Sequence, residues 1–289
     1  MISFFQGKVS WYQKIKPHDP IAIFDSGVGG LTVANALKEI LPHEDIIYFA
    51  DTASRPFGLK SEEELRHILK KNFQNILSYP VKLLVVACHT ACTLPLEIPF
   101  SIPVLKILPI TLKLLKKLPT LSSLLVLGTQ RTLQSQLFQK FLQEHFPSTL
   151  SYFINASSLE KFIEEPSLDN AKITEEILHL LSPYPLSSLR YLLLACTHFP
   201  IYKSLITSLI PSSTQIVDPS IYFARQIQQT LKTRHLLHPP QKRSKELYYT
   251  TSDSQAFQKK LFLYFPHIFL RSEITFQQLD NSIIILQDK

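Results

Sequence analysis

Short apolar runs alternate with amphipathic stretches along most of the chain. Uninterrupted apolar runs are typical of parallel strands that are buried on both faces. We expect such strands at residues 21–24, 45–49, 83–87, 104–108, 124–127, 150–154, 191–195 and 215–217. Apolar positions at helical spacing predict helices at residues 31–41, 61–77, 132–146, 158–165, 173–181 and 221–236. This alternation of strands and helices predicts an α/β fold with mainly parallel sheets and flanking helices.

The order of these elements repeats once. A strand before Asp25 and a later strand before Cys88 correspond to a strand before Gly128 and a later strand before Cys196. The offsets are similar, 103 residues for the first pair and 108 for the second. We therefore expect two similar α/β domains related by pseudo-twofold symmetry. We place their boundaries, with a Pro-rich crossing at residues 94–103, as follows: an N-terminal extension at 1–20, a first domain at 21–101 plus 215–289, and a second domain at 102–214.

The composition is that of a globular protein, with 45% hydrophobic and 18% charged residues among 289. No apolar run approaches the roughly 18 to 20 residues of a membrane span, so we expect no membrane segment. Residues 1–20 lack the apolar core and cleavage site of a signal peptide. Three cysteines are too few for a disulfide framework and indicate a reducing, cytoplasmic location.

The chain is basic, with a net charge of +7 and a pI near 9.2. Such a charge raises the question of a nucleic-acid partner. The positive residues are scattered, however, and the short clusters at 113–117 and 242–245 are not interleaved with aromatic residues for base stacking. We therefore expect a solvated basic surface, which would attract an acidic substrate, and no nucleic-acid partner.

Glycine is scarce and concentrated. The chain has 6 glycines, where average usage of about 7% would give roughly 20. Three of them follow Asp25 and Ser26 in a strand-to-helix turn, a place where backbone N–H groups bind anions. A tight turn without ligand and a nucleotide phosphate loop are the alternatives, although neither G-x-G-x-x-G nor the Lys-containing P-loop spacing matches.

Two of the three cysteines end apolar strands, in the segments Ala87-Cys-His-Thr-Ala91 and Ala195-Cys-Thr-His-Phe-Pro200. A thiol whose pKa falls near a cation can act as base, nucleophile or metal ligand. Two interpretations of these cysteines are therefore open at this point. They form an acid–base pair, or one of them is the single nucleophile of a hydrolase. A zinc site with the ligands Cys88, Cys92, Cys196 and His198 is a third alternative. The absence of a C-x-x-C pair from the sequence speaks against it. By itself, Cys92 is interpreted as a core residue.

Four segments together resemble the signature motifs of bacterial glutamate racemases, members of the cofactor-independent aspartate/glutamate racemase family. Two of them are the cysteine segments just described. The others are Phe24-Asp-Ser-Gly-Val-Gly-Gly-Leu-Thr-Val33 and Asp51-Thr-Ala-Ser-Arg-Pro-Phe-Gly58. The four occur in the family's order, and the resemblance extends from about Ile21 to Asp253, most of the chain.

The resemblance implies two domains that face each other across a cleft in which glutamate binds. It implies racemisation by two thiols, one as base and one as acid, without cofactor or metal, and a role in supplying D-glutamate for peptidoglycan. The implied catalytic residues are Cys88 and Cys196, with Asp25 and His198 assisting proton transfer. The implied substrate contacts are Asp25, Ser26, Pro56, Phe57, Gly58, His89, Thr90, Thr129, Thr197 and His198. Glu164 resembles a second acidic position of the family.

The chain also departs from the family pattern. His89 stands where the family usually has Asn, and a neutral His donates from one ring nitrogen only. The other departures are a missing Pro-Gly at residues 108–110, Phe57 and Phe199 in place of Tyr, and Ser252 in place of Gly. These changes indicate a divergent member. Racemisation of aspartate or another amino acid, and a binding or regulatory protein without turnover, are the alternatives; a homodimer is left open.

Overall fold

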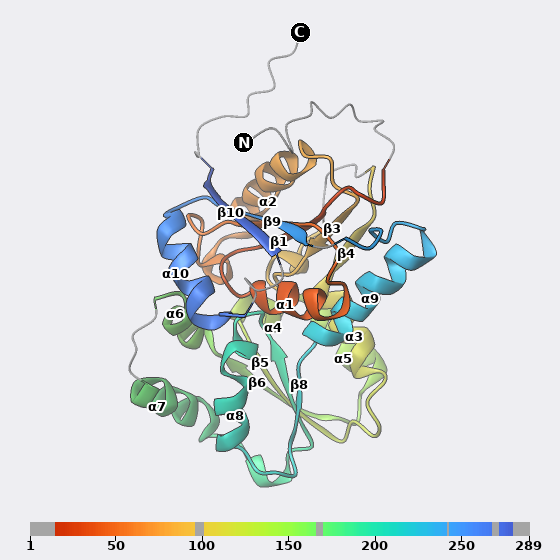
Figure 1. The fold of residues 1–289 in the computed structure, drawn as a ribbon. Helices are drawn as coiled ribbons and strands as arrows, with labels where there is room; N and C mark the ends of the chain where they lie inside the picture. Colours follow the sequence, from red (N-terminus) through yellow and green to blue (C-terminus); the bar gives the residue numbers. More distant parts are fainter. Residues whose placement is uncertain (1–14, 96–100, 166–169, 242, 268–271, 280–289) are drawn as a thin grey trace.

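The computed structural model describes residues 15–95, 101–165, 170–241, 243–267 and 272–279 (Figure 1). Most of the predicted N-terminal extension, residues 1–14, lies outside the described residues. So does the middle of the predicted Pro-rich crossing, residues 96–100. Within the described ranges, no helix is long and apolar enough to cross a membrane.

The larger of two parallel sheets has six strands in the order β10-β9-β2-β1-β3-β4. Every residue of β1, β2 and β3 is buried, as the uninterrupted apolar runs predict. The strands are β1 (Ile21–Asp25), β2 (Ile46–Ala50), β3 (Leu83–Val86), β4 (Val104–Lys106), β9 (Ser244–Thr250) and β10 (Ser272–Gln278).

The smaller sheet has four parallel strands in the order β6-β5-β7-β8. Its strands are β5 (Ser123–Gly128), β6 (Leu150–Asn155), β7 (Tyr191–Ala195) and β8 (Gln215–Val217). Both sheets therefore place their first strand between their second and third, with the fourth at one edge. This shared order confirms the repeat seen in the sequence.

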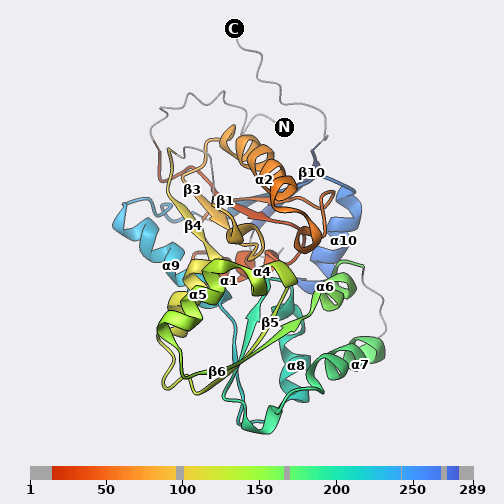
Figure 2. The same ribbon diagram turned by 180° about the vertical axis from the view of Figure 1, so that it is seen from behind.

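Helices surround both sheets, and α1, α4 and α6 lie where the sheets meet in both views (Figure 2). Ser61 and Glu64 form a capping box at the start of α2, where the helix at residues 61–77 was expected. The helices are α1 (Leu31–Ile40), α2 (Glu62–Leu77), α3 (Ile107–Leu115), α4 (Gln130–Gln134), α5 (Gln136–His145), α6 (Ser157–Glu164), α7 (Asn170–Leu181), α8 (Lys203–Leu209), α9 (Ser220–Thr233) and α10 (Ser254–Tyr264). Short 3-10 helices accompany them in the described ranges, η1 (Phe57–Leu59), η2 (Ala91–Thr93), η3 (Leu186–Ser188) and η4 (Phe199–Tyr202).

Two predicted elements differ from those observed. The strand expected at residues 104–108 ends at Lys106, and α3 begins at Ile107. Pro109 does not prevent this helix because proline is tolerated in the first turn. The helix expected at 132–146 is interrupted at Ser135, whose extended backbone ends α4 and whose side chain caps α5.

Strand pairing corrects the predicted domain boundaries. β4 was assigned to the second domain, but it hydrogen-bonds to β3 in the six-stranded sheet. β8 was assigned to the first domain, but it hydrogen-bonds to β7 in the four-stranded sheet. Each of these edge strands therefore pairs with a strand of the other predicted domain. The first boundary moves to the chain after β4, and the second to the chain after β8. The division into two domains itself stays a prediction.

The core extends across the junction of the two sheets. Leu124 and Val126 of β5 belong to the large apolar cluster that includes the six-stranded sheet. Leu125 and Leu127, which point to the opposite face, belong to a second cluster beneath α6, α7 and α8. Because one apolar cluster is shared, packing holds the two halves together around the loops that carry the predicted site.

Candidate active site

The predicted site residues lie at the carboxyl ends of corresponding strands in the two sheets, where ligands bind in open α/β sheets. Direct contacts join them across the sheet junction. Thr197, after β7, donates a hydrogen bond to Asp25 Oδ2 at the end of β1, over 3.1 Å. The Thr90 and Thr129 hydroxyls, after β3 and β5, are 2.9 Å apart. The structure therefore assembles residues from both halves of the chain in one place.

The glycines after Ser26 allow close approach of the two halves. A Cβ at Gly27 would lie 1.7 Å from Glu164 Oε1, and one at Gly29 would lie 2.5 Å from His198 Nδ1. Both distances are too short for non-bonded atoms, so side chains of the second half occupy the space that these glycines leave. These glycines of the sequence are thus needed for a close approach of the two halves.

Asp25 is a buried carboxyl group at the centre of this junction. It accepts a hydrogen bond from the Gly27 N–H over 3.0 Å as well as the one from Thr197. Burial raises the pKa of Asp25 to about 6, against the opposing influence of His198 and these two donors. A carboxyl group with such a pKa can take up and release a proton near neutral pH.

The raised pKa of Asp25 makes a prediction about stability. Because the pKa of Asp25 is about 6 in the folded state and 3.8 for an ordinary aspartate, the folded state binds this proton more tightly than the unfolded chain does. The resulting stabilisation is complete at acidic pH and is lost as the pH rises through about 6. The free energy of unfolding then falls by about 3 kcal/mol. Urea unfolding should therefore show that Asp25→Asn gains stability over the parent at neutral pH but not at about pH 4. Parallel pH profiles for the two proteins would contradict the assignment.

Cys196 has a histidine partner. Its Sγ lies 3.6 Å from His198 Nδ1, and His198 Nε2 lies 2.9 Å from Glu164 Oε1. Burial opposes a charge on this imidazole, but the contacts with Cys196 and Glu164 raise the pKa of His198 well above its ordinary value. The ionised Glu164 can only accept, so Nε2 carries a proton and Nδ1 faces the thiol. His198 can therefore accept the Cys196 proton and stabilise the thiolate.

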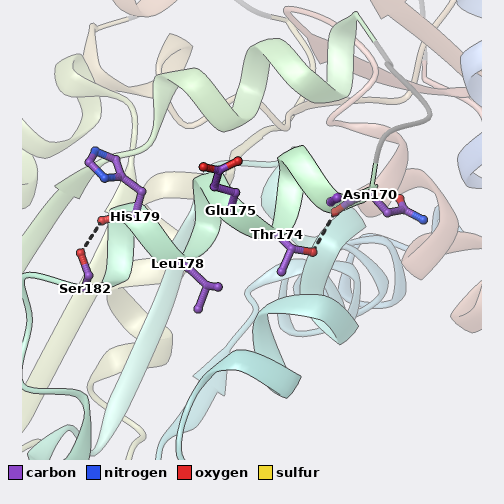
Figure 3. Close-up of a pocket in the computed structure, with 7 residues that line it drawn as sticks. Asn170, Thr174, Glu175, Leu178, His179 and Ser182 are labelled. Carbon is purple, nitrogen blue, oxygen red and sulfur yellow. Dashed lines mark hydrogen bonds between the residues drawn. The ribbon is translucent and has the colours of Figure 1, made fainter.

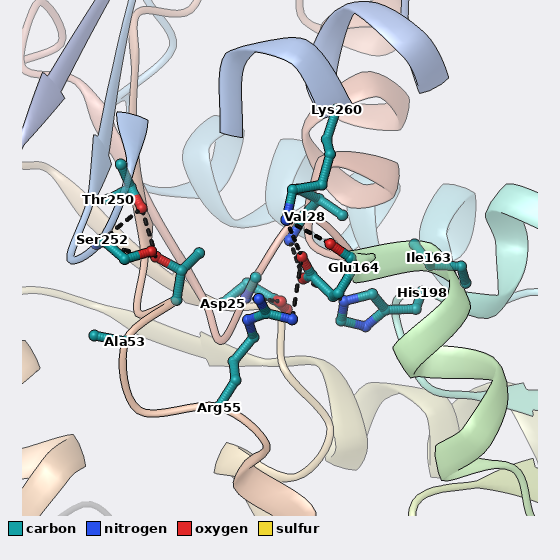
Figure 4. A network of polar contacts seen from close by, with 12 residues as sticks. Asp25, Val28, Ala53, Arg55, Ile163, Glu164, His198, Thr250, Ser252 and Lys260 are labelled. Carbon is teal, nitrogen blue, oxygen red and sulfur yellow. Dashed lines mark hydrogen bonds and ion pairs between the residues drawn. The ribbon is translucent and has the colours of Figure 1, made fainter. Parts of the chain in front are cut away.

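Glu164 joins α6 to three segments of the six-stranded half (Figure 4). Its Oε1 accepts from the Val28 N–H at 2.8 Å, and its Oε2 lies 2.7 Å from Lys260 Nζ and 3.2 Å from Arg55 Nη1. Burial opposes ionisation, yet His198, Arg55 and Lys260 lower the pKa of Glu164. The site therefore holds a carboxylate that is ionised throughout the neutral range.

Arg55 and Lys260 are site residues that the sequence reasoning missed. Arg55 lies inside the recognised segment 51–58, so its position was a usable signal. Lys260 lies on α10, which was not predicted as a helix. Nothing in its local sequence distinguishes it from other lysines.

Cys88 is the more difficult of the two thiols to ionise. Its Sγ lies 3.6 Å from Ser26 Oγ and 3.5 Å from the Ala91 nitrogen. Burial first, and then the nearby Asp25, raise the pKa of Cys88 well above its ordinary value, and a charge on Cys196 raises it further. Burial also raises the pKa of Cys196, but His198 opposes the shift. Of the two thiols, Cys196 is therefore the one whose histidine partner favours the thiolate.

The remaining predicted contacts are distributed unevenly. The Phe57 ring packs against Phe24 in the core, with 6.3 Å between centroids. Pro56 is exposed, and a Cβ at Gly58 would lie 3.3 Å from Thr129 Cβ. His89 contacts Thr111 on α3 through Nε2.

The zinc alternative does not assemble. Cys92 Sγ donates to the Val86 carbonyl oxygen, 3.6 Å away. In the described part of the chain, no three or more His, Cys, Asp or Glu side chains are arranged to hold a metal ion. A shallow hollow does lie along α7, lined by Thr174, Leu178 and neighbouring residues (Figure 3). It contains none of the predicted site residues, so we do not regard it as the site.

Comparison with known proteins decides the family. No protein-family model matches the sequence. A glutamate racemase from Carboxydothermus hydrogenoformans is 32% identical over 271 residues, which cover 92% of this chain and 97% of that protein. The chain belongs to the glutamate racemase family.

Solved structures of glutamate racemases share its fold. An isoform from Bacillus anthracis has a TM-score of 0.82 at 27% identity and covers 92% of this chain and 98% of its own. The protein from Thermus thermophilus, solved with β-chloro-D-alanine, has a TM-score of 0.76 at 27% identity with the same coverage. The predicted family and the α/β fold with two mainly parallel sheets are confirmed. Membership in the glutamate racemase family also identifies the chain as an amino-acid racemase, an isomerase.

Proposed function

We propose that this protein interconverts L- and D-glutamate by moving the Cα proton between Cys88 and Cys196, without cofactor. The carrying observation is that the two thiols occupy corresponding strand ends of the two sheets, and that the Thr197–Asp25 hydrogen bond joins these strand ends. Racemisation needs a base on one face of Cα and an acid on the other. Two thiols from pseudo-symmetric halves meet this requirement.

In one direction, the Cys196 thiolate removes the proton from Cα and becomes a thiol. The resulting carbanion takes a proton from the Cys88 thiol on its opposite face, which leaves Cys88 as thiolate. The reverse direction exchanges the two roles. His198, paired with Cys196, supports the first thiolate, and Asp25 beside Cys88 accepts or returns the second proton.

The site excludes water around this proton transfer. Cys88 and Cys196 are only 5% and 6% exposed, and the Thr90–Thr129 contact joins the two halves beside them. Glutamate therefore reaches the thiols only when the halves separate at this junction. Glutamate is bound through its polar groups by the hydroxyl groups of Ser26, Thr90, Thr129 and Thr197. The main chain at residues 56–58 also contacts it.

The product suits a role in cell-wall synthesis, because D-glutamate is a constituent of peptidoglycan. We propose that the protein supplies it in the cytoplasm, with glutamate as its small-molecule partner. The net charge of +7 favours the approach of a substrate that carries two carboxylates.

A substrate panel tests this function. The purified protein, dialysed against a chelator, is incubated separately with each enantiomer of glutamate, aspartate and alanine, and the products are separated by chiral chromatography. We expect both glutamate enantiomers to approach a 1:1 mixture, with much slower conversion of the others. A preference for aspartate would show that aspartate, and not glutamate, is the substrate. Absence of any turnover would favour a binding protein.

A further inference from the structure

One peptide unit of the glycine turn after β1 is held at both ends. Tyr48, on β2, donates a hydrogen bond from its hydroxyl group to the Gly27 carbonyl oxygen over 2.8 Å. The N–H of the same peptide unit belongs to Val28, and it donates to Glu164 Oε1 over 2.8 Å (Figure 4). The C=O and N–H of a trans peptide point in opposite directions. The peptide therefore lies between a tyrosine of the six-stranded sheet and a carboxylate of α6.

The turn leaves room for the Tyr48 hydroxyl group. A Cβ at Gly30 would lie 2.6 Å from Tyr48 Oη, which is closer than non-bonded atoms approach. The Tyr48 side chain is fully buried, and its ring packs against Tyr248 and Phe257 with 5.7 and 5.9 Å between centroids. Because this packing fixes the ring, the hydroxyl group has one position from which to hold the turn.

Without the Tyr48 hydrogen bond, the peptide between Gly27 and Val28 could rotate. Glycine populates a wider range of backbone angles than any other residue, so the rotation has little steric cost. It would turn the Val28 N–H away from Glu164 and the Gly27 carbonyl oxygen toward it. Burial first, and then Asp25 and Glu164, raise the pKa of Tyr48 well above its ordinary value. The hydroxyl group therefore keeps its proton, and its donation to Gly27 opposes the rotation throughout the neutral range.

We propose that Tyr48 is a positioning residue for racemisation, which holds this peptide so that Glu164 stays in place beside His198. Glu164 Oε1 lies 2.8 Å from the Val28 nitrogen and 2.9 Å from His198 Nε2, so one oxygen accepts from both groups. His198 Nδ1 in turn faces the Cys196 thiol. Tyr48 acts through these contacts and not on the substrate. The inference rests on the proposed function, in which Cys196 exchanges the Cα proton.

Tyr48→Phe removes the hydroxyl group and keeps the ring. We expect kcat for glutamate to fall by about 3- to 10-fold, the factor that corresponds to one ordinary hydrogen bond. KM should change by less than about twofold, because a loss confined to kcat is expected where substrate binding is untouched.

Tyr191→Phe is the matched control. Tyr191 is a fully buried strand tyrosine on β7, and its hydroxyl group also donates to a main-chain carbonyl oxygen, that of Pro119, over 2.7 Å. It begins the strand that ends before Cys196, so its hydrogen bond lies away from the site. Urea unfolding should show a similar loss of stability in both variants, while only Tyr48→Phe loses kcat.

Nuclear magnetic resonance tests the path from Tyr48 to the histidine. In the parent protein, the Val28 amide should be protected from hydrogen exchange, and the His198 Nε2 proton should resonate far downfield, as for a proton bound to a carboxylate. In Tyr48→Phe, we expect the Val28 amide to exchange severalfold faster and the His198 signal to move upfield. Tyr191→Phe should leave both signals as they are in the parent.

The outcomes distinguish this inference from the proposed function. An unprotected Val28 amide in the parent would overturn the inference, and this measurement needs no variant. Equal losses of kcat in Tyr48→Phe and Tyr191→Phe would overturn it as well, and so would an unchanged kcat in a folded Tyr48→Phe protein. In each of these cases, racemisation by the parent protein would leave the proposed function standing. Failure of the parent to racemise glutamate would remove both.

Discussion

Replacing either Cys88 or Cys196 with serine should stop racemisation in both directions while the fold persists. Serine has nearly the shape of cysteine, but its hydroxyl group is far too weak an acid to exchange the Cα proton. Each direction uses both thiols, one to remove the proton and one to supply it. Since a positioned acid or base contributes about 10²- to 10⁴-fold, we expect each variant to lose at least about a hundredfold in rate by chiral chromatography.

Cys92→Ser is the matched control for these variants. Cys92 is equally buried, but its Sγ contacts the Val86 carbonyl oxygen, which a serine hydroxyl can also do. This variant should keep its activity. An equimolar mixture of Cys88→Ser and Cys196→Ser should stay inactive, because one site needs both thiols. Activity within tenfold of the parent in either single variant would refute the two-thiol assignment.

Glu164→Gln is expected to weaken both the fold and the reaction. The substitution keeps the shape but removes the charge that faces Arg55, Lys260 and His198. Loss of one partner from a buried ion pair typically costs about 3 to 5 kcal/mol, because the remaining charge stays buried. We expect a loss of this size by urea unfolding at neutral pH.

The pH dependence of this loss has a definite sign. The folded-state pKa of Glu164 is lowered, so its stabilisation is complete above the ordinary glutamate pKa of 4.5 and decreases as the pH falls below it. The difference between parent and Glu164→Gln should therefore shrink on acidification. Racemisation should slow as well, because His198 loses the carboxylate that holds a proton on Nε2.

Glu165→Gln provides the control for Glu164→Gln. Glu165 is the next residue along the chain and is exposed, so its charge faces solvent. It should lose neither stability nor rate. Equal effects of the two substitutions would show that the network of Figure 4 does not carry the stabilisation.

The apolar runs predicted eight strands because parallel strands buried on both faces need side chains without charge. The same reasoning missed β9, in which Lys245 and Glu246 interrupt the pattern. Glu246 is buried there because Lys38 of α1, with Nζ 3.5 Å from Glu246 Oε1, supplies the opposite charge. A partner some two hundred residues away in the sequence leaves no local signal.

The site was predictable to the extent that it consists of motifs. Asp25, Cys88, Cys196 and His198 lie in recognised segments, and the structure brings them together. The charges around Glu164 come from segments that meet only in the folded chain, so the sequence could not group them. His89 was visible as a departure from the family, but its contact with Thr111 required the structure.

The most direct test of the two-thiol reaction is isotopic. Each enantiomer of glutamate is incubated with the protein in deuterium oxide, and both enantiomers are analysed by mass spectrometry within the first few per cent of conversion. If one thiol removes the proton and the other delivers a different one, the newly formed enantiomer carries deuterium while the unreacted substrate keeps protium. Product that retains the substrate's own protium would show a single base returning one proton, and would contradict the account.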